Sequence, residues 1–193
     1  MNIDELDKKA GYFKNNPITD PKQIDREKLR WHKMDESWLS AIRGNRQFWF
    51  TGFKIEQFHI PEKLLSHAKQ ILSLRDHLLK FGGEQACMPT TEPHIEKILS
   101  RGQFWYGDIA KSERGEPSRC HSNIAKLWNN DKENIKIVIG YALSNDGMWR
   151  QHSWGIKINE TQNTIIETTE PRIGYFGFVL SNDESEIFYE NEV

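Results

Sequence analysis

Four apolar runs in the C-terminal third of the chain constrain its fold more than any other feature. The runs cover residues 135–144, 148–158, 163–169 and 173–181, and β-branched and aromatic residues are frequent in them. Short turn-forming segments separate the runs, among them NDG, NETQN and TEPR. Runs at this spacing are typical of strands joined by tight turns, and NDG between two of them indicates a hairpin. The sequence therefore predicts an antiparallel meander sheet in this part of the chain.

Helices are expected mainly in the N-terminal half. Residues 61–83 place leucine and isoleucine at intervals of three and four, and two glycines end the pattern. A shorter helix is predicted within residues 92–102, and another from Cys120 to the pair of asparagines that follows it. The predicted fold class is therefore α+β, with the helix that carries Cys120 at its N-terminus packed on the C-terminal sheet.

Two parts of different character are predicted along the chain. Residues 1–46 have few apolar positions, and Pro17 and Pro21 interrupt any periodicity, so an N-terminal helical or irregular extension is expected. Residues 47–193 are expected to form one α+β domain. This domain would begin with an extended segment or hairpin at residues 47–60.

The composition is that of a globular protein, with 37% apolar and 28% charged residues in a chain of 193. The net charge of -2 and the lack of a dense basic stripe argue against nucleic acid as a partner. The N-terminus lacks the apolar stretch of a signal peptide, and no long apolar run predicts a membrane span. Two cysteines do not make a disulfide scaffold, so a cytoplasmic setting is expected, with export by a route that uses no cleaved signal as the alternative. No cofactor is predicted, and the oligomeric state is left open.

Cys120 is the strongest candidate for a catalytic group. It follows the Gly/Pro loop GEPSR and begins a predicted helix, whose unpaired N–H groups favour an anion such as a thiolate. A thiol nucleophile also needs a base and a polar group that orients the base. His152 in the second predicted strand and Glu167 in the third can fill these two roles. In isolation, by contrast, a cysteine here is more often a small buried apolar residue.

The predicted hairpin brings His152 near a carboxylate. A turn centred near residue 161 places His152 opposite the region of residue 170, and a small shift brings Glu167, Thr169 or Glu170 beside it. Alternation along the two strands allows His152 and Glu167 to share one face of the sheet. We therefore predict a Cys120–His152–Glu167 triad, with the identity of the orienting residue still open.

A second group of residues is predicted to bind substrate near this triad. Arg150 shares the strand parity of His152, so it can bind a carboxylate near the base or pair with Asp146 or Glu167. The two tryptophans of WRQHSWG can shield a thiolate–imidazolium pair from water or simply pack in the sheet. The complete set of predicted substrate-binding residues is Gln103, Trp105, His121, Asn123, Trp149, Arg150 and Trp154.

Two other functions compete with the cysteine hydrolase. A binding module without catalysis would use the aromatic residues around Trp105, Trp149 and Trp154 as a groove for a peptide or small ligand. A zinc-dependent hydrolase would use Cys120, His121 and His152, which are residue types that suit zinc. The chain contains no CxxC or HExxH spacing, and so no metal ligand is assigned.

The order of a helix-start cysteine, a strand histidine and a carboxylate on the next strand is similar to the papain-like superfamily in its broad sense. This superfamily includes papain-type peptidases, bacterial cell-wall peptidases and amidases, transglutaminases and deamidating effectors. The resemblance covers about residues 102–180 and rests on topology and three residue types, because SRCHSN replaces the papain-type CGSCW.

The resemblance implies a role for each residue of the triad. Cys120 would be the nucleophile, His152 the general base and then the acid, and Glu167 the orienting residue. The papain-type oxyanion glutamine has its nearest upstream counterpart in Gln103, which is far from Cys120 in sequence, so the backbone N–H of Cys120 is the safer donor. The implied function is hydrolysis or acyl transfer at a peptide-like amide, with a peptide or small amide-containing substrate.

Overall fold

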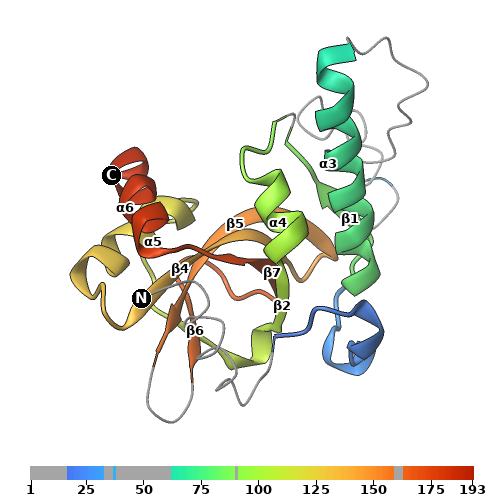
Figure 1. The fold of residues 1–193 in the computed structure, drawn as a ribbon. Coiled ribbons are helices and arrows are strands. Elements are labelled where there is room, and N and C mark those ends of the chain that lie inside the picture. Colours follow the sequence, from blue (N-terminus) through green and yellow to red (C-terminus); the bar gives the residue numbers. More distant parts are fainter. Residues whose placement is uncertain (1–16, 33–36, 38–61, 90, 159–162) are drawn as a thin grey trace.

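The computed structural model describes residues 17–32, 37, 62–89, 91–158 and 163–193. The extended segment predicted at residues 47–60 and most of the extension predicted at residues 1–46 lie outside these residues. Within them the protein combines helices with one curled sheet, which confirms the α+β class (Figure 1).

In the described part of the chain the sheet has seven strands, most of them antiparallel. The order is β2-β7-β4-β5-β6-β3, and β1 pairs with β5 in parallel outside this path. The strands are β1 (Gln85–Cys87), β2 (Gln103–Tyr106), β3 (Ala110–Ser112), β4 (Ile135–Leu143), β5 (Met148–Lys157), β6 (Thr164–Glu167) and β7 (Gly174–Val179).

The helices are α3 (Glu62–Phe81), α4 (Ile95–Arg101), α5 (Cys120–Asn130) and α6 (Asn182–Glu192), with short 3-10 turns at Pro21–Gln23, Arg26–Lys28 and Gly107–Ile109. Helix α3 matches the helix predicted over residues 61–83, and α5 begins at Cys120 as predicted. Among the described helices, none combines the length and the apolar composition needed to cross a bilayer.

The four predicted runs form β4 to β7, but the last of them departs from a simple meander. Strand β7 crosses back and pairs with β4 instead of β6. All nine residues of β4 are buried, and such a strand needs a partner on each edge, which β5 and β7 provide. The three short strands β1, β2 and β3 and the helix α6 were not predicted.

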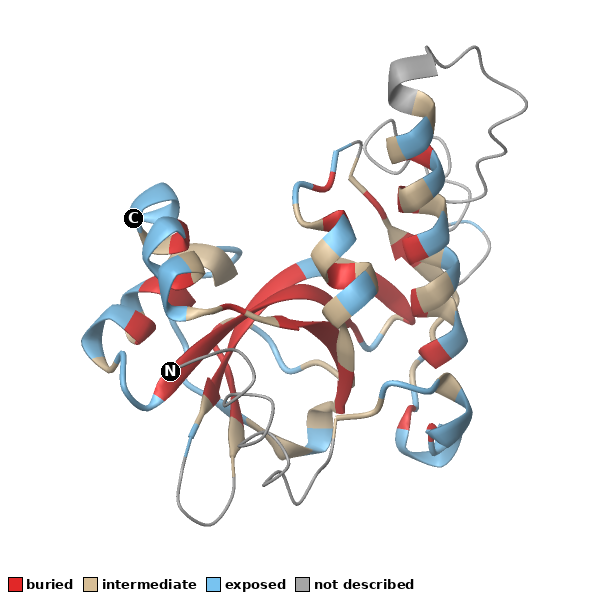
Figure 2. Ribbon diagram, in the orientation of Figure 1, coloured by how far each residue is buried: buried red, intermediate tan, exposed pale blue. Residues whose placement is uncertain are grey.

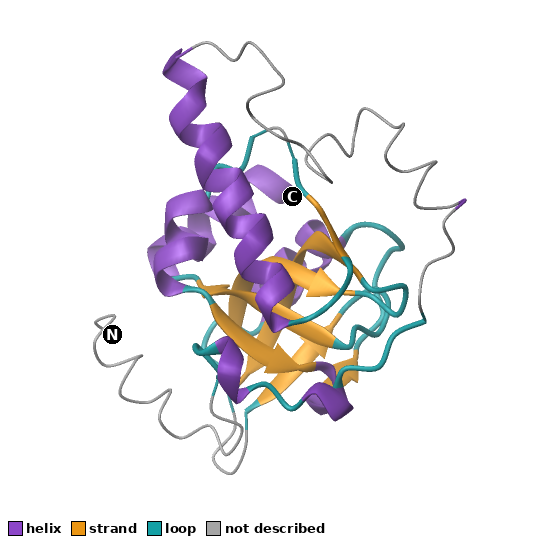
Figure 3. Cartoon of the chain, turned by 90° about the vertical axis from the view of Figure 1, so that its right-hand side faces the viewer, coloured by secondary structure: helices purple, strands orange, loops and turns teal. Residues whose placement is uncertain are grey.

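The two faces of the sheet carry different parts of the core. The apolar residues of α3, α4 and α5 pack on one face, here called the helix face, together with alternate residues of β4 and β7. The opposite face, here called the inner face, carries a smaller cluster with Trp105, Trp154 and Tyr175. Figure 2 shows the central strands β4 and β7 almost entirely buried, and Figure 3 shows α3 beside the curled sheet. Alternation along β5 therefore sends His152 and Ser153 to opposite faces.

Residues 17–32 pack against the domain. Ile18 forms a backbone bridge with Phe104, while Ile24 and Leu29 are buried in the core of the helix face. Trp31 Nε1 donates a hydrogen bond of 3.0 Å to Glu84. The described part of the predicted extension thus shares the core of the domain.

Candidate active site

Helix α5 begins at Cys120 without a side-chain cap. Arg119 occupies the cap position but makes no capping hydrogen bond, and the backbone N–H of Asn123 closes the first turn on its carbonyl at 2.8 Å. The first N–H groups of a helix have no partner inside the helix, and they carry its partial positive charge. The thiol is therefore attached to the positive end of α5.

The loop before Cys120 is fastened to the helix and to β6. Both polar groups of the Asn123 amide bind the backbone of Glu116, at 3.0 and 2.8 Å. The N–H of Glu113 donates to the carbonyl of Glu167 at 2.8 Å. Gly115 lies so close to Asn123 that an added Cβ would come within 2.5 Å of its side chain. Asn123, predicted to bind substrate, thus holds the loop that delivers the cysteine.

An open interval on the edge of β5 receives the start of α5. Along this edge β1 pairs with residues 148–150 and β6 with residues 155–157. Residues 151–154 between them have no strand partner on that side within the described part of the chain. The backbone N–H of Ser153 in this interval is hydrogen-bonded to Cys120 and favours its thiolate form. The sheet edge thus supplies a fixed dipole to the sulfur.

His152 lies between Cys120 and Glu167 and is hydrogen-bonded to both. Its Nε2 is 2.9 Å from Oε2 of Glu167, which leaves Nδ1 as the ring nitrogen for Cys120. The ring is almost fully buried, and Trp154 stacks beside it with a centroid distance of 6.2 Å and an interplanar angle of 16°. Burial alone would lower the pKa of His152, but the bonds to Cys120 and Glu167 outweigh it and raise the pKa to about 9.

The two cysteines differ in the ionisation of their thiols. Burial raises the pKa of Cys120, but its hydrogen bond to His152, the charge of that ring and the N–H of Ser153 together bring the pKa below its ordinary value. Burial raises the pKa of Cys87, against a smaller effect of Arg150. Both cysteines are free thiols. Only Cys120 therefore has the surroundings of a reactive thiolate.

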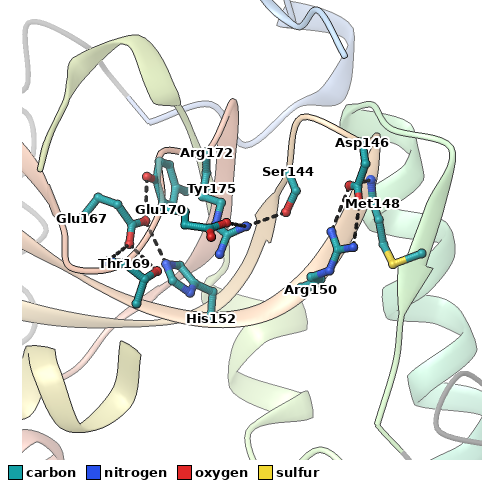
Figure 4. A network of polar contacts seen from close by, with 10 residues as sticks. All are labelled: Ser144, Asp146, Met148, Arg150, His152, Glu167, Thr169, Glu170, Arg172 and Tyr175. Atoms are coloured by element: carbon teal, nitrogen blue, oxygen red, sulfur yellow. Dashed lines mark hydrogen bonds and ion pairs between the residues drawn. The ribbon is translucent and has the colours of Figure 1, made fainter. Parts of the chain in front are cut away.

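The carboxylate of Glu167 is buried and accepts four hydrogen bonds (Figure 4). Oε2 accepts from His152 and from the Tyr175 hydroxyl, each at 2.9 Å. Oε1 accepts from the backbone N–H and the hydroxyl of Thr169, at 2.8 and 2.9 Å. Burial raises the pKa of Glu167, but these bonds, above all the one to His152, lower it below its ordinary value. The ionised carboxylate of Glu167 is thus fixed beside the imidazole of His152.

The strand register explains why Glu167 is the residue that meets His152. The β5–β6 ladder ends at the pair Gly155 and Ile166, and the same register extended by three pairs would set Thr169 opposite His152. The chain instead bends after Glu167, and Thr169 binds the carboxylate of Glu167. The third candidate, Glu170, is exposed and lies 4.0 Å from Arg172. Glu167 is thus the carboxylate that contacts the histidine.

The tryptophans predicted to line a groove are buried. Trp105 packs edge-on against Trp154 on the inner face, with ring centroids 6.0 Å apart. Trp149 points to the helix face, where its Nε1 donates to the carbonyl of Gly82 at 2.8 Å. Because the three rings are divided between two faces and are at most 3% exposed, they do not form an open aromatic groove.

Arg150 is engaged by another side chain, and Gln103 lies far from Cys120. Arg150 forms a forked ion pair with Asp146, at 2.9 and 2.6 Å, which was one of the two partners considered for it. Gln103 pairs with Gly177 on the far side of β4, so three strand spacings, about 14 Å, separate it from His152 across the sheet. The fold thus does not bring Gln103 to the position of an oxyanion donor.

His121, the neighbour of Cys120, points to a separate polar surface. Its Nδ1 lies 2.5 Å from the hydroxyl of Ser153, and its ring meets Phe188 edge-on. Burial lowers the pKa of His121, so the ring is neutral at neutral pH. A depression of about 260 Å³ opens beside it, lined by Ser118, Arg119, His121, Ser122 and Glu192. His121, one of the predicted substrate-binding residues, thus lies at a cavity next to the cysteine.

No metal centre accompanies the site among the residues that the structure describes. No group of three histidine, cysteine, aspartate or glutamate side chains there has the arrangement to hold a metal ion. His121 is directed to Ser153, whereas His152 is directed to Glu167, so the two rings do not converge with Cys120 on one point. The zinc hydrolase considered from sequence lacks support in this geometry.

Two contributors were missed by the sequence analysis. The backbone N–H of Ser153 reaches Cys120 because its strand edge is open, and side-chain patterns carry no signal for that. The hydroxyl of Tyr175 reaches Glu167 because β7 crosses back beside β4. The IGYFGFVL run contains Tyr175, but the predicted meander would have placed its strand elsewhere.

No model of a known protein family matches this chain, and no curated protein or solved structure gives a significant match either. A functional assignment therefore has to be argued from the geometry of the site.

Proposed function

We propose that the protein is a cysteine-dependent hydrolase or acyl transferase that acts on a peptide-like amide or a related carbonyl bond. The observation that carries the proposal is the chain of hydrogen bonds from Cys120 through His152 to Glu167. The lowered pKa of Cys120 and the raised pKa of His152 both favour a thiolate–imidazolium pair. The same order of residues supports the resemblance to papain-like enzymes.

In the acylation step the Cys120 thiolate attacks the carbonyl carbon, and a sulfur–carbon bond forms while the carbonyl π electrons move to oxygen. The resulting oxyanion collapses, the carbon–nitrogen bond breaks, and the His152 imidazolium gives its proton to the leaving amine. The products are a thioester on Cys120 and a free amine. Glu167 stays ionised throughout and holds the imidazole in place.

In the deacylation step neutral His152 takes a proton from water, and the hydroxide oxygen bonds to the thioester carbon. The carbon–sulfur bond breaks, the acid is released, and the thiolate–imidazolium pair is restored. An amine in place of water gives transfer instead of hydrolysis. The uncapped N-terminus of α5, beginning with the N–H of Cys120, is suited to stabilise the oxyanion in both steps.

The depression beside His121 supports a polar substrate. Arg119 and Glu192 give its lining both signs of charge, and Ser118 and Ser122 add hydroxyl groups. A peptide or a small amide with polar substituents fits such a surface better than an apolar acyl chain. We further infer a reducing, cytoplasmic setting with no nucleic acid partner, on the basis of the two free thiols and the net charge of -2.

The test uses p-nitrophenyl acetate, an activated acyl donor that needs no specific recognition. We expect a burst of p-nitrophenol and an acetyl group on Cys120 in the mass spectrum of peptides from the full chain. Cys120→Ala should abolish both signals, and the matched variant Cys87→Ala should keep them. Acetylation that persists in Cys120→Ala, or that falls on both cysteines equally, would contradict the proposal.

A further inference from the structure

Tyr175 and Glu167 are packed together on the inner face of the sheet. Tyr175 is fully buried in β7, and its hydroxyl donates to Oε2 of Glu167, the oxygen that also faces His152. Its ring is 5.0 Å from that of Trp154 and 6.3 Å from the imidazole, centroid to centroid. A phenylalanine can keep these ring contacts, so the hydroxyl can be tested apart from the packing.

The hydroxyl of Tyr175 can act only as a donor toward the carboxylate. Burial and the negative charge of Glu167 raise the pKa of Tyr175 far above its ordinary value, so the phenol stays protonated. The opposite oxygen of Glu167 is held by two further donors, the N–H and the hydroxyl of Thr169. Fixed donors on both oxygens prevent the carboxylate from turning away from the imidazole.

We infer that Tyr175 and Thr169 are positioning residues for the proposed reaction: they keep Glu167 ionised and directed at His152. This inference rests on the proposed function, because it assigns a task within the same triad. Both residues act through Glu167, whose carboxylate oxygens accept their hydrogen bonds. The charged groups that face this network are His152 on β5 and Cys120 on α5, while Arg172 acts on Tyr175 from the turn before β7.

The inference predicts a change in the pH dependence of Cys120. Without the phenol, the Glu167 anion loses a donor and becomes protonated at a higher pH. The imidazolium then loses its support earlier as the pH falls, so the thiolate–imidazolium pair is lost at a higher pH than in the wild type. If Tyr175 had only a structural role, its replacement would not change the pH at which the thiolate–imidazolium pair is lost on acidification.

The chain offers a matched control in Tyr141. This tyrosine is also fully buried, and its hydroxyl donates to another buried carboxylate, that of Glu92, at 2.7 Å. It lies on β4 with its ring in the core of the helix face. Tyr141→Phe therefore removes the same hydroxyl from a comparable setting outside the triad.

The experiment measures the rate of Cys120 alkylation by iodoacetamide against pH in the full chain carrying Cys87→Ser. We expect Tyr175→Phe to be roughly tenfold slower below the ordinary cysteine pKa, with its acid limb at higher pH, because one hydrogen bond to a charged group is lost. Thr169→Val should also slow the alkylation, but less, because the backbone N–H of residue 169 still donates to Glu167. Thr169→Ser keeps a hydroxyl at this position, so its rate should return to that of the wild type. Tyr141→Phe should match the wild type.

The outcomes separate this inference from the proposed function. A wild-type Cys120 that is reactive at low pH, with Tyr175→Phe and Thr169→Val superimposable on it, overturns the positioning role and leaves the hydrolase proposal intact. A wild-type Cys120 with an ordinary thiol profile overturns both. Should Tyr175→Phe fail to fold, as judged by circular dichroism, the comparison of Thr169→Val with Thr169→Ser decides the question alone.

Discussion

Two buried carboxylates lie on opposite faces of the sheet, and they differ in their partners. Glu167 and Glu92 are each 1% exposed, and each accepts a hydrogen bond from a buried tyrosine, Tyr175 or Tyr141. The second partner of Glu167 is the titratable ring of His152, whereas Glu92 meets the side-chain amide of Gln151 at 3.0 Å.

The difference shows what turns a buried anion into part of a candidate site. Gln151 and His152 are neighbours on β5, and the alternation of the strand sends them to different carboxylates. Only the pair on the inner face extends to a thiol, because His152 also binds Cys120. Burial and a tyrosine donor are common to both sites, so neither of them by itself indicates catalysis.

The largest expected effect is on the rate of Cys120 alkylation when the charge of each carboxylate is removed in turn. Glu167→Gln removes the anion that supports the imidazolium, so the rate of Cys120 alkylation near neutral pH should fall roughly 100-fold or more. Glu92→Gln should leave this rate unchanged. Both rates are measured with iodoacetamide on folded protein that carries Cys87→Ser. If the rate of Cys120 alkylation falls equally in Glu167→Gln and Glu92→Gln, Glu167 has no special role at Cys120.

The second prediction concerns stability against pH, measured as the free energy of unfolding in urea. The folded pKa of Glu167 is lowered, so its contribution is present above the ordinary value of 4.5 and is lost as the pH falls. The folded pKa of His152 is raised from 6.5 to about 9, so its contribution is present below 6.5 and is lost by about pH 9. Glu167→Gln should therefore cost most between pH 4.5 and 6.5, on the order of 2–3 kcal/mol. A loss of unfolding free energy that does not change with pH would contradict an ion pair between Glu167 and His152.

Local sequence signals placed Cys120 at a helix start and His152 in a neighbouring hairpin, but they did not decide which residue contacts the histidine. The Gly/Pro loop and the periodicity after it placed Cys120 at a helix start, and the structure begins α5 there. A short turn between two apolar runs fixed the hairpin to within a few residues, which limited the neighbours of His152 to Glu167, Thr169 and Glu170. Alternation alone also separates Trp149 from Trp154, which the prediction of one aromatic groove had overlooked.

The remaining features depend on contacts between distant segments. The pairing of β7 with β4 reflects the burial of β4 on both edges, and no turn or period near Tyr175 encodes it. The open edge at Ser153 arises because β1 and β6 pair with different ends of β5. Both features are set by strand order, which local patterns do not specify.

The third prediction tests the tyrosine on the helix face. Tyr141→Phe leaves Glu92 with one donor fewer in a buried setting, so the protein should lose about 1–2 kcal/mol of unfolding free energy. The alkylation rate of Cys120 should not change. Urea denaturation and iodoacetamide labelling of the same preparation check both statements. A slower Cys120 in this variant would place Glu92 in functional contact with the triad.

The smallest effect is expected at Gln151, directly beside His152 in the chain. Its side chain is exposed apart from the bond to Glu92, so Gln151→Ala should cost less than about 1 kcal/mol of stability. The alkylation rate should stay within roughly threefold of wild type, because the backbone of β5 continues to hold His152 and Ser153. A larger loss of rate would mean that the Gln151 amide contributes to the surroundings of the thiolate. The two faces would then be coupled through adjacent side chains, and sheet alternation would not be sufficient to isolate the Cys120–His152–Glu167 chain from its neighbour.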